Sequence, residues 1–537
     1  MKKFLYIILV SCFSLAIISC AEKDESTAEK DESTTTATTT TTTTTLSAPS
    51  TLTATGGTGQ VTLDWTSVSG ASSYTVYWDN TSGISSSSTA ITSVSTDNYT
   101  HSGLDHGITN YYKVAAVDSA GTGTLSSEAS ARTSILLGGS IQGEEIILGG
   151  KVTTFAGPPA GTTTSGDTDN ATASNARFNQ PIGSSSDGTS FYIAEYGNNK
   201  IRRINISSGE VTTLAGPPAG TTTSGDTDNA TASNARFNMP VGMTTDGTNL
   251  YVTEEGNNKI RKIVISSGAV TTFAGPPAGT TTSGDTDNAT ASNARFYMPY
   301  GITTDGTNLY VSDSSNNKIR KIVISSGEVT TLAGPPAGTT TSGSTDNATA
   351  SNARFNRPAG IVTDGTNLYV ADWQGNKIRK IVISSGEVTT IAGPPAGTTT
   401  SGDTDNDTPS NARFNRPFGM TIDGINLFVS DVANNKIRKI VISSGKVTTI
   451  AGPPAGTSAS GDTDNDTASN ARFSSPFGIT SDGINLFVKD NIVGKLKQCP
   501  KEQRNFSVNF SLNDIYKRFF INFLTRSKFL YAINFNK

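Results

Sequence analysis

The stretch that decides the fold runs over residues 358–393 and reads PAGIVTDGTNLYVADWQGNKIRKIVISSGEVTTIAG. It contains four short strand-like segments, at residues 358–364, 367–372, 377–383 and 387–393. The joins between these segments are rich in Asp, Gly, Asn and Ser, which favour tight turns. Four short strands without a helical pattern between them predict one blade of a β-propeller.

This unit is one of a series of closely similar copies. The phrase Val-Thr-Thr-x-Ala-Gly begins at residues 152, 211, 270, 329, 388 and 447, so consecutive copies start 59 residues apart (211 − 152 = 59). A constant period of this length is typical of propellers and solenoids. The array spans residues 151–498 and begins with a fourth-type strand at Val152. We therefore expect the Val152 strand to complete the last blade and close the ring, with nothing after Gln498 needed for closure.

The copies carry Pro-x-Gly-Ile, Asp-Gly, Leu-Tyr-Val-x-Asp and Asn-Lys-Ile-Arg in this order, with few changes. This pattern resembles the NHL repeat family. The resemblance implies a six-bladed NHL-type β-propeller, because propellers of this family commonly have six blades and the starting phrase occurs six times.

A different pattern precedes the array. Residues 46–134 contain short runs of period-two alternation, such as residues 61–65 and 112–117, which predict antiparallel strands with one buried face. Pro49 stands at the start of the segment, Trp65 late in its second expected strand and Tyr74 on the third. With these residues at these places, the segment resembles the fibronectin type III family. The resemblance implies a β-sandwich. The predicted fold class is therefore all-β, a fibronectin type III-like β-sandwich followed by a six-bladed NHL-type β-propeller.

The segment departs from the fibronectin type III pattern at one place. The family's corner tyrosine would fall at Asn110, so either Tyr111 is displaced by one position or the corner hydrogen bond is absent. His101 and His106 flank the turn at Leu104, and we expect them to be solvated loop residues rather than metal ligands. Residues 135–150 are interpreted as a linker.

The N-terminus has the features of an export signal. Lys2 and Lys3 precede an apolar run over residues 4–18, which predicts a signal peptide over residues 1–19. The run ends Ile-Ile-Ser-Cys20 and resembles a lipobox, which implies lipidation at Cys20. The alternative is an uncleaved membrane anchor with an incidental cysteine. We expect an exported protein, lipid-anchored to the bacterial cell envelope at the outer membrane or cell surface, with the Thr-rich residues 20–45 as a disordered tether.

The C-terminal residues 499–537 are unlike the array. The repeat decays after Asp490, and Cys499 opens a segment rich in phenylalanine. We interpret this tail as a frameshifted or recruited terminus, or else as an extra packing strand, and neither interpretation assigns it a function.

Composition excludes several classes of function. The net charge is −4 and no block of basic residues is present, which argues against nucleic acid as a partner. The chain has 3 cysteines and 2 histidines, and neither histidine lies in the array. No Ser-His-Asp or Cys-His set can therefore be assembled on the propeller. These observations favour a binding protein over an enzyme, although a carboxylate-metal-dependent hydrolase of the lactonase-like kind remains the alternative. We expect the protein to be a monomer.

The positions that vary between copies are the candidate ligand-binding residues. They are the residue before the first-strand proline, the residue after it, and the residue after the acid that ends the second strand, all expected at one mouth of the central channel. Large aromatic and arginine side chains at such a mouth suit a protein or glycan ligand. The candidates, to which Tyr297 is added, are Tyr196, Tyr297, Tyr300, Arg357, Trp373, Arg416, Phe418 and Phe477. The alternative is drift at positions under weak packing constraint.

The acids that end the second strands form a second candidate set. A ring of carboxylates could hold Ca²⁺, which favours six to eight oxygen ligands. The alternative is that each acid accepts hydrogen bonds within its own turn, and recurrence in every copy favours this alternative. We expect no cofactor unless these acids bind Ca²⁺. The acids are Glu195, Glu254, Asp313, Asp372, Asp431 and Asp490.

Taken together, the sequence predicts a membrane-tethered exported binding protein whose propeller face engages a protein or glycan. The hydrolase is one alternative, and an architectural envelope protein without a specific ligand is another.

Overall fold

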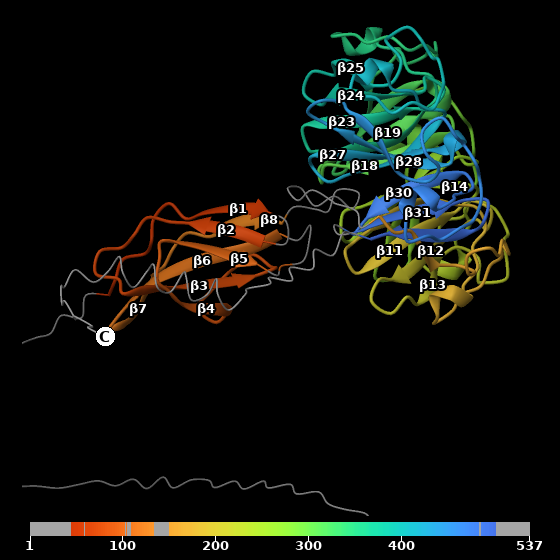
Figure 1. Cartoon of the computed structure of the whole chain (residues 1–537). Helices are drawn as coiled ribbons and strands as arrows, with labels where there is room; N and C mark the ends of the chain where they lie inside the picture. The colour runs from red at the N-terminus through yellow and green to blue at the C-terminus, as the bar shows by residue number, and fades with distance from the viewer. Residues whose placement is uncertain are drawn as a thin grey trace, which may run out of the picture. The chain divides into compact units, whose positions relative to one another are not determined.

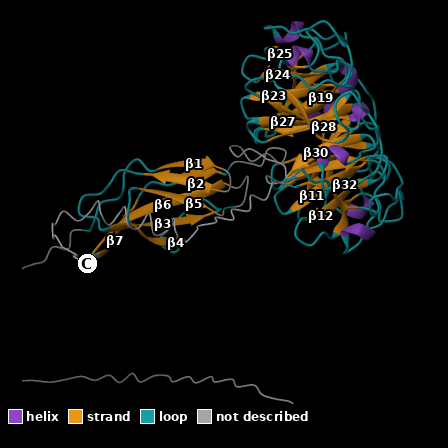
Figure 2. Cartoon of the chain, in the orientation of Figure 1, coloured by secondary structure: helices purple, strands orange, loops and turns teal. Residues whose placement is uncertain are grey.

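The computed structural model describes residues 45–57, 60–102, 104, 109–133, 150–482 and 485–500 of the 537 residues. The predicted signal peptide, the lipidation at Cys20, nearly all of the tether and linker, His106 and residues 501–537 lie outside the described residues. Strands dominate, and the helices are single short turns in connecting loops (Figure 2). No helix in the described part of the chain is long and apolar enough to cross a membrane. The described chain is all-β.

The first folded part consists of two antiparallel sheets around one core. One sheet contains β1 (Thr53–Gly57), β2 (Gln60–Asp64) and β5 (Asn98–Ser102). The other contains β4 (Thr89–Val94), β3 (Ser73–Asp79), β6 (Thr109–Asp118) and β7 (Gly121–Leu125), with β8 (Ala129–Arg132) also paired to β6. Alternate residues of β2 are buried, as the period-two pattern predicts. Val61 and Leu63 of β2 meet Val76 of β3 and Val114 of β6 in the core.

The expectation that His101 is a solvated loop residue is wrong. His101 lies in β5, where its Nδ1 is 3.2 Å from the hydroxyl of Tyr112 and its ring packs edge-on against Trp78 at 4.4 Å between centroids. Burial lowers the pKa of His101. The strand continues past the point where turn residues were expected, because residues 98–102 pair with β2 along their whole length.

The repeat array forms six four-stranded antiparallel sheets, numbered here in chain order. Sheet 1 contains β10 (Pro181–Ser186), β11 (Ser190–Glu195), β12 (Lys200–Asn205) and β13 (Val211–Ala215). Sheet 2 contains β14 (Pro240–Thr245), β15 (Asn249–Glu254), β16 (Lys259–Val264) and β17 (Val270–Ala274). Sheet 3 contains β18 (Pro299–Thr304), β19 (Asn308–Asp313), β20 (Lys318–Val323) and β21 (Val329–Ala333).

The remaining three sheets follow the same order. Sheet 4 contains β22 (Pro358–Thr363), β23 (Asn367–Asp372), β24 (Lys377–Val382) and β25 (Val388–Ala392). Sheet 5 contains β26 (Pro417–Ile422), β27 (Asn426–Asp431), β28 (Lys436–Val441) and β29 (Val447–Ala451). Sheet 6 contains β30 (Pro476–Ser481), β31 (Leu486–Asp490), β32 (Lys495–Cys499) and β9 (Thr153–Ala156).

Short 3-10 turns and tight hairpins connect these strands. In sheet 4, Oδ1 of Asp364 accepts the N–H groups of Thr366 at 2.8 Å and Asn367 at 2.6 Å, which builds the turn between β22 and β23. The 3-10 turns are η1 (Ala173–Asn175), η2 (Ala232–Asn234), η3 (Ala291–Asn293), η4 (Ser314–Asn316), η5 (Ala350–Asn352), η6 (Pro409–Asn411), η7 (Val432–Asn434) and η8 (Ala468–Asn470).

The predicted overlap of the chain ends is confirmed. β9 pairs with β32, with Thr154 opposite Lys497 and Thr153 opposite Gln498. The first strand of each sheet contacts the first strand of the next, and β10 contacts β30, so the six sheets form a closed ring. In Figure 1 the blue β30 and β31 of sheet 6 accordingly lie next to sheet 1, whose β11–β13 are drawn in yellow. The repeated four-stranded sheets form a β-propeller, in which β9 covers the edge of β32 and becomes the outer strand of sheet 6.

The predicted end of the array at Gln498 is one residue short. β32 continues to Cys499, which pairs with Leu486 and is 1% exposed. Ile440 of sheet 5 occupies the equivalent place opposite Leu427 and is also buried. Cys499 therefore serves as a small apolar core residue rather than as the first residue of the tail.

Candidate functional site

One end of the ring is built from the positions that differ between the copies. The residue after the first-strand proline and the residue after the second-strand acid pack there into one hydrophobic cluster, called the mouth cluster here. Its buried members are Ile182, Val241, Ala359, Phe418 and Val432, with the half-buried Tyr196, Tyr300, Trp373 and Phe477 packed against them. All six sheets contribute to this cluster.

The backbone at the start of each first strand presents these side chains. The residue before the proline has a left-handed conformation in every copy, with φ of 53° at Arg357 and 58° at Arg416. Such a conformation is costly for a residue other than glycine, so the surroundings must hold it in place. An asparagine of the preceding sheet does so: the N–H of Arg357 bonds Asn317 Oδ1, and the N–H of Arg416 bonds Asn376 Oδ1, both at 2.9 Å. The side chains of Arg357 and Arg416 are exposed.

The aromatic members of the mouth cluster touch one another across sheets 3–6. Phe418 lies at their centre, with ring centroids 5.8 Å from Tyr300, 6.2 Å from Trp373 and 4.9 Å from Phe477. Tyr300 and Trp373 are 6.1 Å apart. These tilted and edge-to-face contacts are favourable arrangements for aromatic rings. The rings form one continuous apolar surface that no single copy could provide.

A carboxylate borders this aromatic surface. Glu255 follows the second-strand acid of sheet 2 and interacts with the hydroxyls of Tyr196 and Tyr300. Burial raises the pKa of Glu255, while the two tyrosines and the nearby Arg357 lower it in part. Burial and the adjacent Glu255 raise the pKa of Tyr196 to about 12. The mouth therefore combines an aromatic surface with several polar side chains. These are the carboxylate of Glu255, the hydroxyls of Tyr196 and Tyr300, and the guanidinium of Arg357.

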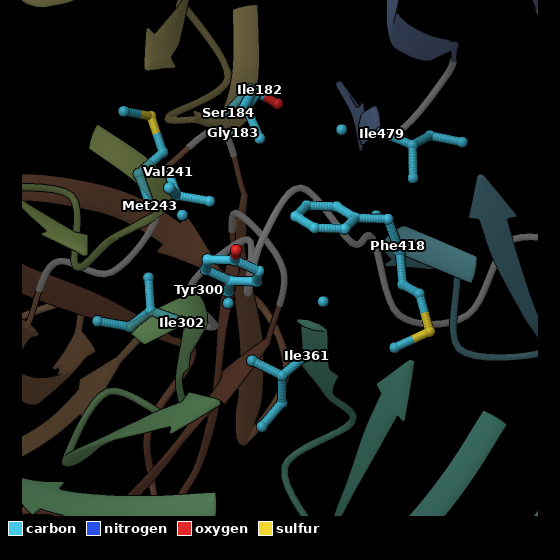
Figure 3. A pocket seen from close by; sticks show the side chains of 16 residues that line it. Ile182, Gly183, Ser184, Val241, Met243, Tyr300, Ile302, Ile361, Phe418 and Ile479 are labelled. Carbon is cyan, nitrogen blue, oxygen red and sulfur yellow. The ribbon is translucent and has the colours of Figure 1, made fainter. Parts of the chain in front are cut away.

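A small cavity of ≈ 70 Å³ lies in the channel beside the mouth cluster. Tyr300, Phe418, Ile182 and Val241 line it where it meets the cluster, and Figure 3 shows the rings of Tyr300 and Phe418 next to each other. Deeper lining side chains are mainly apolar and come from the first strands: Ser184, Met243, Ile302, Ile361, Met420 and Ile479. The cavity has room for a small group only.

The glycine of Pro-x-Gly makes this narrow channel geometrically feasible. At Gly301 a Cβ would overlap the carbonyl oxygen of Ala359 in the next sheet, and at Gly478 it would overlap that of Ile182 across the closing junction. Close approach of two backbones is a common reason for glycine within a strand. The same overlap occurs at each of the six equivalent glycines, so the motif is needed for neighbouring first strands to approach around the ring.

The second-strand acids do not face a shared site. In sheet 3, Asp313 is fully buried, accepts the N–H of Tyr297 at 2.8 Å and the amide of Asn316 at 2.9 Å, and pairs with Arg320 at 2.8 Å. The equivalent arginine pairs are Glu195–Arg202 at 2.9 Å, Glu254–Arg261 at 3.0 Å, Asp372–Arg379 at 3.2 Å and Asp431–Arg438 at 2.8 Å. Each of these acids is thus bonded within its own sheet. This arrangement agrees with the alternative that each acid accepts hydrogen bonds locally instead of binding Ca²⁺.

The sixth acid has lost most of these partners. Asp490 accepts the N–H of Ser474 at 2.8 Å, but Lys497 stands in place of the arginine and pairs with Asp462 and Asp464. Burial raises the pKa of Asp490 to about 8. Within the described ranges, no three His, Cys, Asp or Glu side chains are grouped so that they could hold a metal ion.

The structure brings together five of the eight candidate ligand residues, namely Tyr196, Tyr300, Trp373, Phe418 and Phe477. Arg357 and Arg416 are exposed at the starts of β22 and β26. Tyr297 lies outside the cluster and is 42% exposed. Glu255 was not among the candidates. Its signal was a second acid directly after Glu254, which occurs in this copy alone.

Comparisons with known proteins show that the chain is similar in sequence to NHL repeat proteins. The chain is 27% identical over 311 residues to NHL repeat-containing protein 2 of Homo sapiens, covering 52% of this chain and 41% of that protein. It is 27% identical over 284 residues to the chloroplastic protein SUPPRESSOR OF QUENCHING 1 of Arabidopsis thaliana, covering 50% of this chain and 26% of that protein. The chain thus spans less than half the length of these curated relatives. No family model matches the chain.

Among solved structures, the chain is similar to an auxiliary nutrient binding protein from Bacteroides thetaiotaomicron, with a TM-score of 0.46 and 15% identity over 84% of this chain and 98% of that chain. The sequence likeness to NHL repeat proteins and the repeated four-stranded sheets together support an NHL-type β-propeller.

Proposed function

We propose that this protein is a binding module whose mouth cluster engages a partner protein or glycan. The observation that carries the proposal is the concentration of aromatic side chains at positions where the copies differ. The framework residues of the copies are nearly unchanged, yet Tyr300, Trp373, Phe418 and Phe477 all enter one cluster. Drift at weakly constrained positions would not be expected to select large aromatic residues that contact one another.

The rim of the same end supports a contact surface. Met239 and Tyr297 lie in the segments that precede first-strand prolines, and Ile492 follows the second strand of sheet 6. Their exposed fractions are 39%, 42% and 62%, which is high for large apolar side chains. Exposed apolar residues around half-buried aromatic ones are typical of recognition surfaces. Arg357 and Arg416 would add directed hydrogen-bond donors at this rim.

The proposal also includes the number of propeller blades, the type of the first folded module and the attachment of the protein. The six four-stranded sheets support a six-bladed NHL-type propeller. The two preceding sheets with Trp65 and Tyr74 in their core support a fibronectin type III-like module, which would act as a spacer. We further propose that the protein is exported and anchored by lipid on Cys20 at the bacterial cell envelope, and that it acts as a monomer; the lipobox-like sequence supports the anchor.

The chain itself supplies substitutions that test the mouth without disturbing the fold. Trp373→Ser takes the residue of the equivalent place in sheet 3, Ser314, and Arg357→Met takes that of Met298. After a ligand is found on an array of glycans and purified extracellular matrix proteins, we expect each variant to weaken binding by about tenfold or more. Affinity would be measured by calorimetric titration of the full chain.

Ile425→Ala serves as the matched control. Ile425 is 43% exposed in the turn after β26, at the end of that strand away from the mouth. This variant should keep full affinity. Unchanged binding by Trp373→Ser and Arg357→Met, with a ligand that the wild-type chain holds, would locate recognition elsewhere and overturn the proposal.

A further inference from the structure

The outer part of each sheet contains a buried cluster of charges, and one copy lacks a member. In five copies an aspartate from the loop before the first strand reaches the lysine that begins the third strand. The distances between Lys Nζ and the carboxylate are 2.5 Å for Lys200–Asp167, 2.6 Å for Lys259–Asp226, and 2.7 Å for both Lys318–Asp285 and Lys436–Asp403, and Lys495 pairs with Asp462 in the same way. The lysines are fully buried.

The arginine of the third strand also approaches this carboxylate. Arg202 Nη1 is 3.9 Å from Asp167, and Arg438 Nη1 is 3.8 Å from Asp403. The N–H of Gly220 donates to Asp167 Oδ2 at 2.8 Å. The carboxylate therefore occupies a built anion position, with a lysine, an arginine and a backbone N–H around it.

Sheet 4 has Ser344 where the other copies have this aspartate. Ser344 is 4% exposed, and its hydroxyl has no hydrogen-bond partner among the residues that the structure describes. Lys377 is fully buried and donates to the carbonyl of Pro395 at 2.8 Å, its one hydrogen-bond acceptor in the described chain. The N–H of Gly397 bonds the backbone carbonyl of Ser344 at 2.5 Å, as the N–H of Gly220 bonds that of Asp167 at 3.1 Å. The lysine and the arginine of the anion position therefore remain in sheet 4, as Lys377 and Arg379, while the carboxylate is lost.

The charge balance of the copies indicates what the position can accept. In sheet 1, Lys200 and Arg202 are surrounded by Asp167, Asp169 and Glu195, which sums to −1 (2 − 3 = −1). In sheet 4, Lys377 and Arg379 face only Asp346 and Asp372, which sums to 0 (2 − 2 = 0). The same framework thus holds one further negative charge in the other copies. Burial, followed by the neighbouring Arg379, lowers the pKa of Lys377 to about 8, which reflects the missing partner.

A cavity borders this position. Its volume is ≈ 310 Å³, and its lining includes Pro395, which accepts the hydrogen bond of Lys377, and Asp346, which pairs with Arg379 at 2.7 Å. Pro409 and Ser410 form the other side of the cavity. Ser344, Lys377 and Arg379 do not line this cavity, so it neighbours the anion position without being part of it.

We propose that sheet 4 binds a small monovalent anion, the size of chloride or formate, where the other five sheets place an aspartate carboxylate. Lys377 Nζ and the Ser344 hydroxyl donate to it, and the Arg379 guanidinium lies beside it. A buried lysine without a direct ion-pair partner is destabilising, and an anion that binds only the folded chain raises its stability. The site is independent of the mouth cluster, so it stands whether or not the proposed ligand-binding function does.

Thermal melting of the full chain in different anions tests this site. At equal ionic strength, chloride and formate should each raise the melting temperature saturably above the value in gluconate, by about 3 °C at saturation. Ser344→Asp restores the residue of the other copies, so it should raise the melting temperature in gluconate and abolish the difference between anions. Asp285→Ser in sheet 3 is the matched variant, and it should add a second anion-dependent increment.

A direct measurement separates this site from general salt effects. Crystals of the wild-type chain soaked in bromide should give an anomalous peak beside Lys377, and crystals of Ser344→Asp should lack that peak. Equal anion dependence of the wild-type and Ser344→Asp chains would overturn the proposal. Bromide peaks that appear only away from Lys377 in wild-type crystals would also overturn the proposal. This outcome does not depend on whether the variants fold.

Discussion

At the scale of single residues, the copies act as internal controls for one another, and Lys489 is the residue that departs furthest. It lies in β31 directly before Asp490, where the other sheets have Ala194, Thr253, Ser312, Ala371 or Ser430. The Ser430 hydroxyl accepts the N–H of Gly419 at 2.7 Å and donates to the carbonyl of Phe477 in the next sheet. Lys489 is fully buried, and its ammonium group contacts only the carbonyl of Phe487, at 3.3 Å, among the described residues.

We expect Lys489→Ser to stabilise the propeller by about 2 kcal/mol or more, because it removes an unpaired buried amine and restores a hydroxyl between sheets 6 and 1. Burial lowers the pKa of Lys489 well below its ordinary value. The free energy of unfolding would be measured by urea denaturation. Ser312→Ala, at the equivalent place in sheet 3, should change stability by less than about 1 kcal/mol. Equal or lower stability of Lys489→Ser would mean that the amine has a partner.

Lys377 predicts a pH dependence whose sign can be worked out. Its pKa is about 8 in the folded chain, below the value of about 10.4 for an unfolded lysine. Between these values the unfolded chain binds more protons, so the contribution of Lys377 to stability rises as pH increases from about 8 to about 10.4. In gluconate buffer, we expect the melting temperature of Ser344→Asp to lack this rise relative to the wild-type chain. Parallel profiles for the two proteins across that window would contradict the assignment.

At the scale of elements, the strand β9 completes a sheet whose other strands lie more than 300 residues later in the chain. The N–H of Thr154 donates to Asp464 Oδ2 at 2.6 Å, as the N–H of the equivalent Thr213 in sheet 1 donates to Asp169 Oδ2 at 2.9 Å. Each outer strand therefore holds the acidic loop of its own sheet as well as its neighbouring strand. The closing sheet therefore makes the same bond between outer strand and loop as a sheet made from continuous sequence.

We expect Thr154→Pro and Thr213→Pro to destabilise the propeller by similar amounts, about 3 kcal/mol each, because both remove the N–H donor and disturb the strand. Thermal melting of the two variants beside the wild-type chain measures this. Thr163→Pro, in an exposed loop, is the control and should have a small effect. A chain that tolerates Thr154→Pro but not Thr213→Pro would show that β9 is dispensable for closure.

At the scale of the whole molecule, the ring depends on close approach of first strands at its centre and on buried ion pairs farther out. Glycines such as Gly301 permit the approach, and arginines such as Arg320 stack over a phenylalanine while pairing with the second-strand acid. Since those acids are already bonded to arginine and to backbone N–H groups, a metal ion would have to replace existing partners to bind them.

We therefore expect removal of divalent metals with a chelator, and later addition of Ca²⁺, to leave the melting temperature of the propeller unchanged. Differential scanning calorimetry of the full chain measures this, with calorimetric titration of Ca²⁺ alongside. Magnesium at the same concentration is the control for non-specific charge effects. A saturable rise with Ca²⁺ alone, at about one site, would revive the carboxylate-metal hydrolase.

The prediction of the ring was possible because its determinants are local and repeated. Turn residues such as Asp364 and Gly365, and the alternation around Leu368 and Val370, specify strands within one copy, and the phase of the copies specifies that Val152 must join the last one. Strands that follow one another in the chain pair with each other within one copy. The repeated pattern therefore predicts which strands pair.

The sequence by itself thus determined the strands, their order and the closure of the ring. Only the tertiary structure decided that Tyr300, Trp373 and Phe418 touch, that Glu255 joins them, and that Lys377 and Lys489 are buried without a carboxylate partner in the described chain. The physical reason is that these relations join side chains from different copies, or depend on burial. Packing and desolvation are set by which residues the ring brings together in space, and not by the order of residues within a copy.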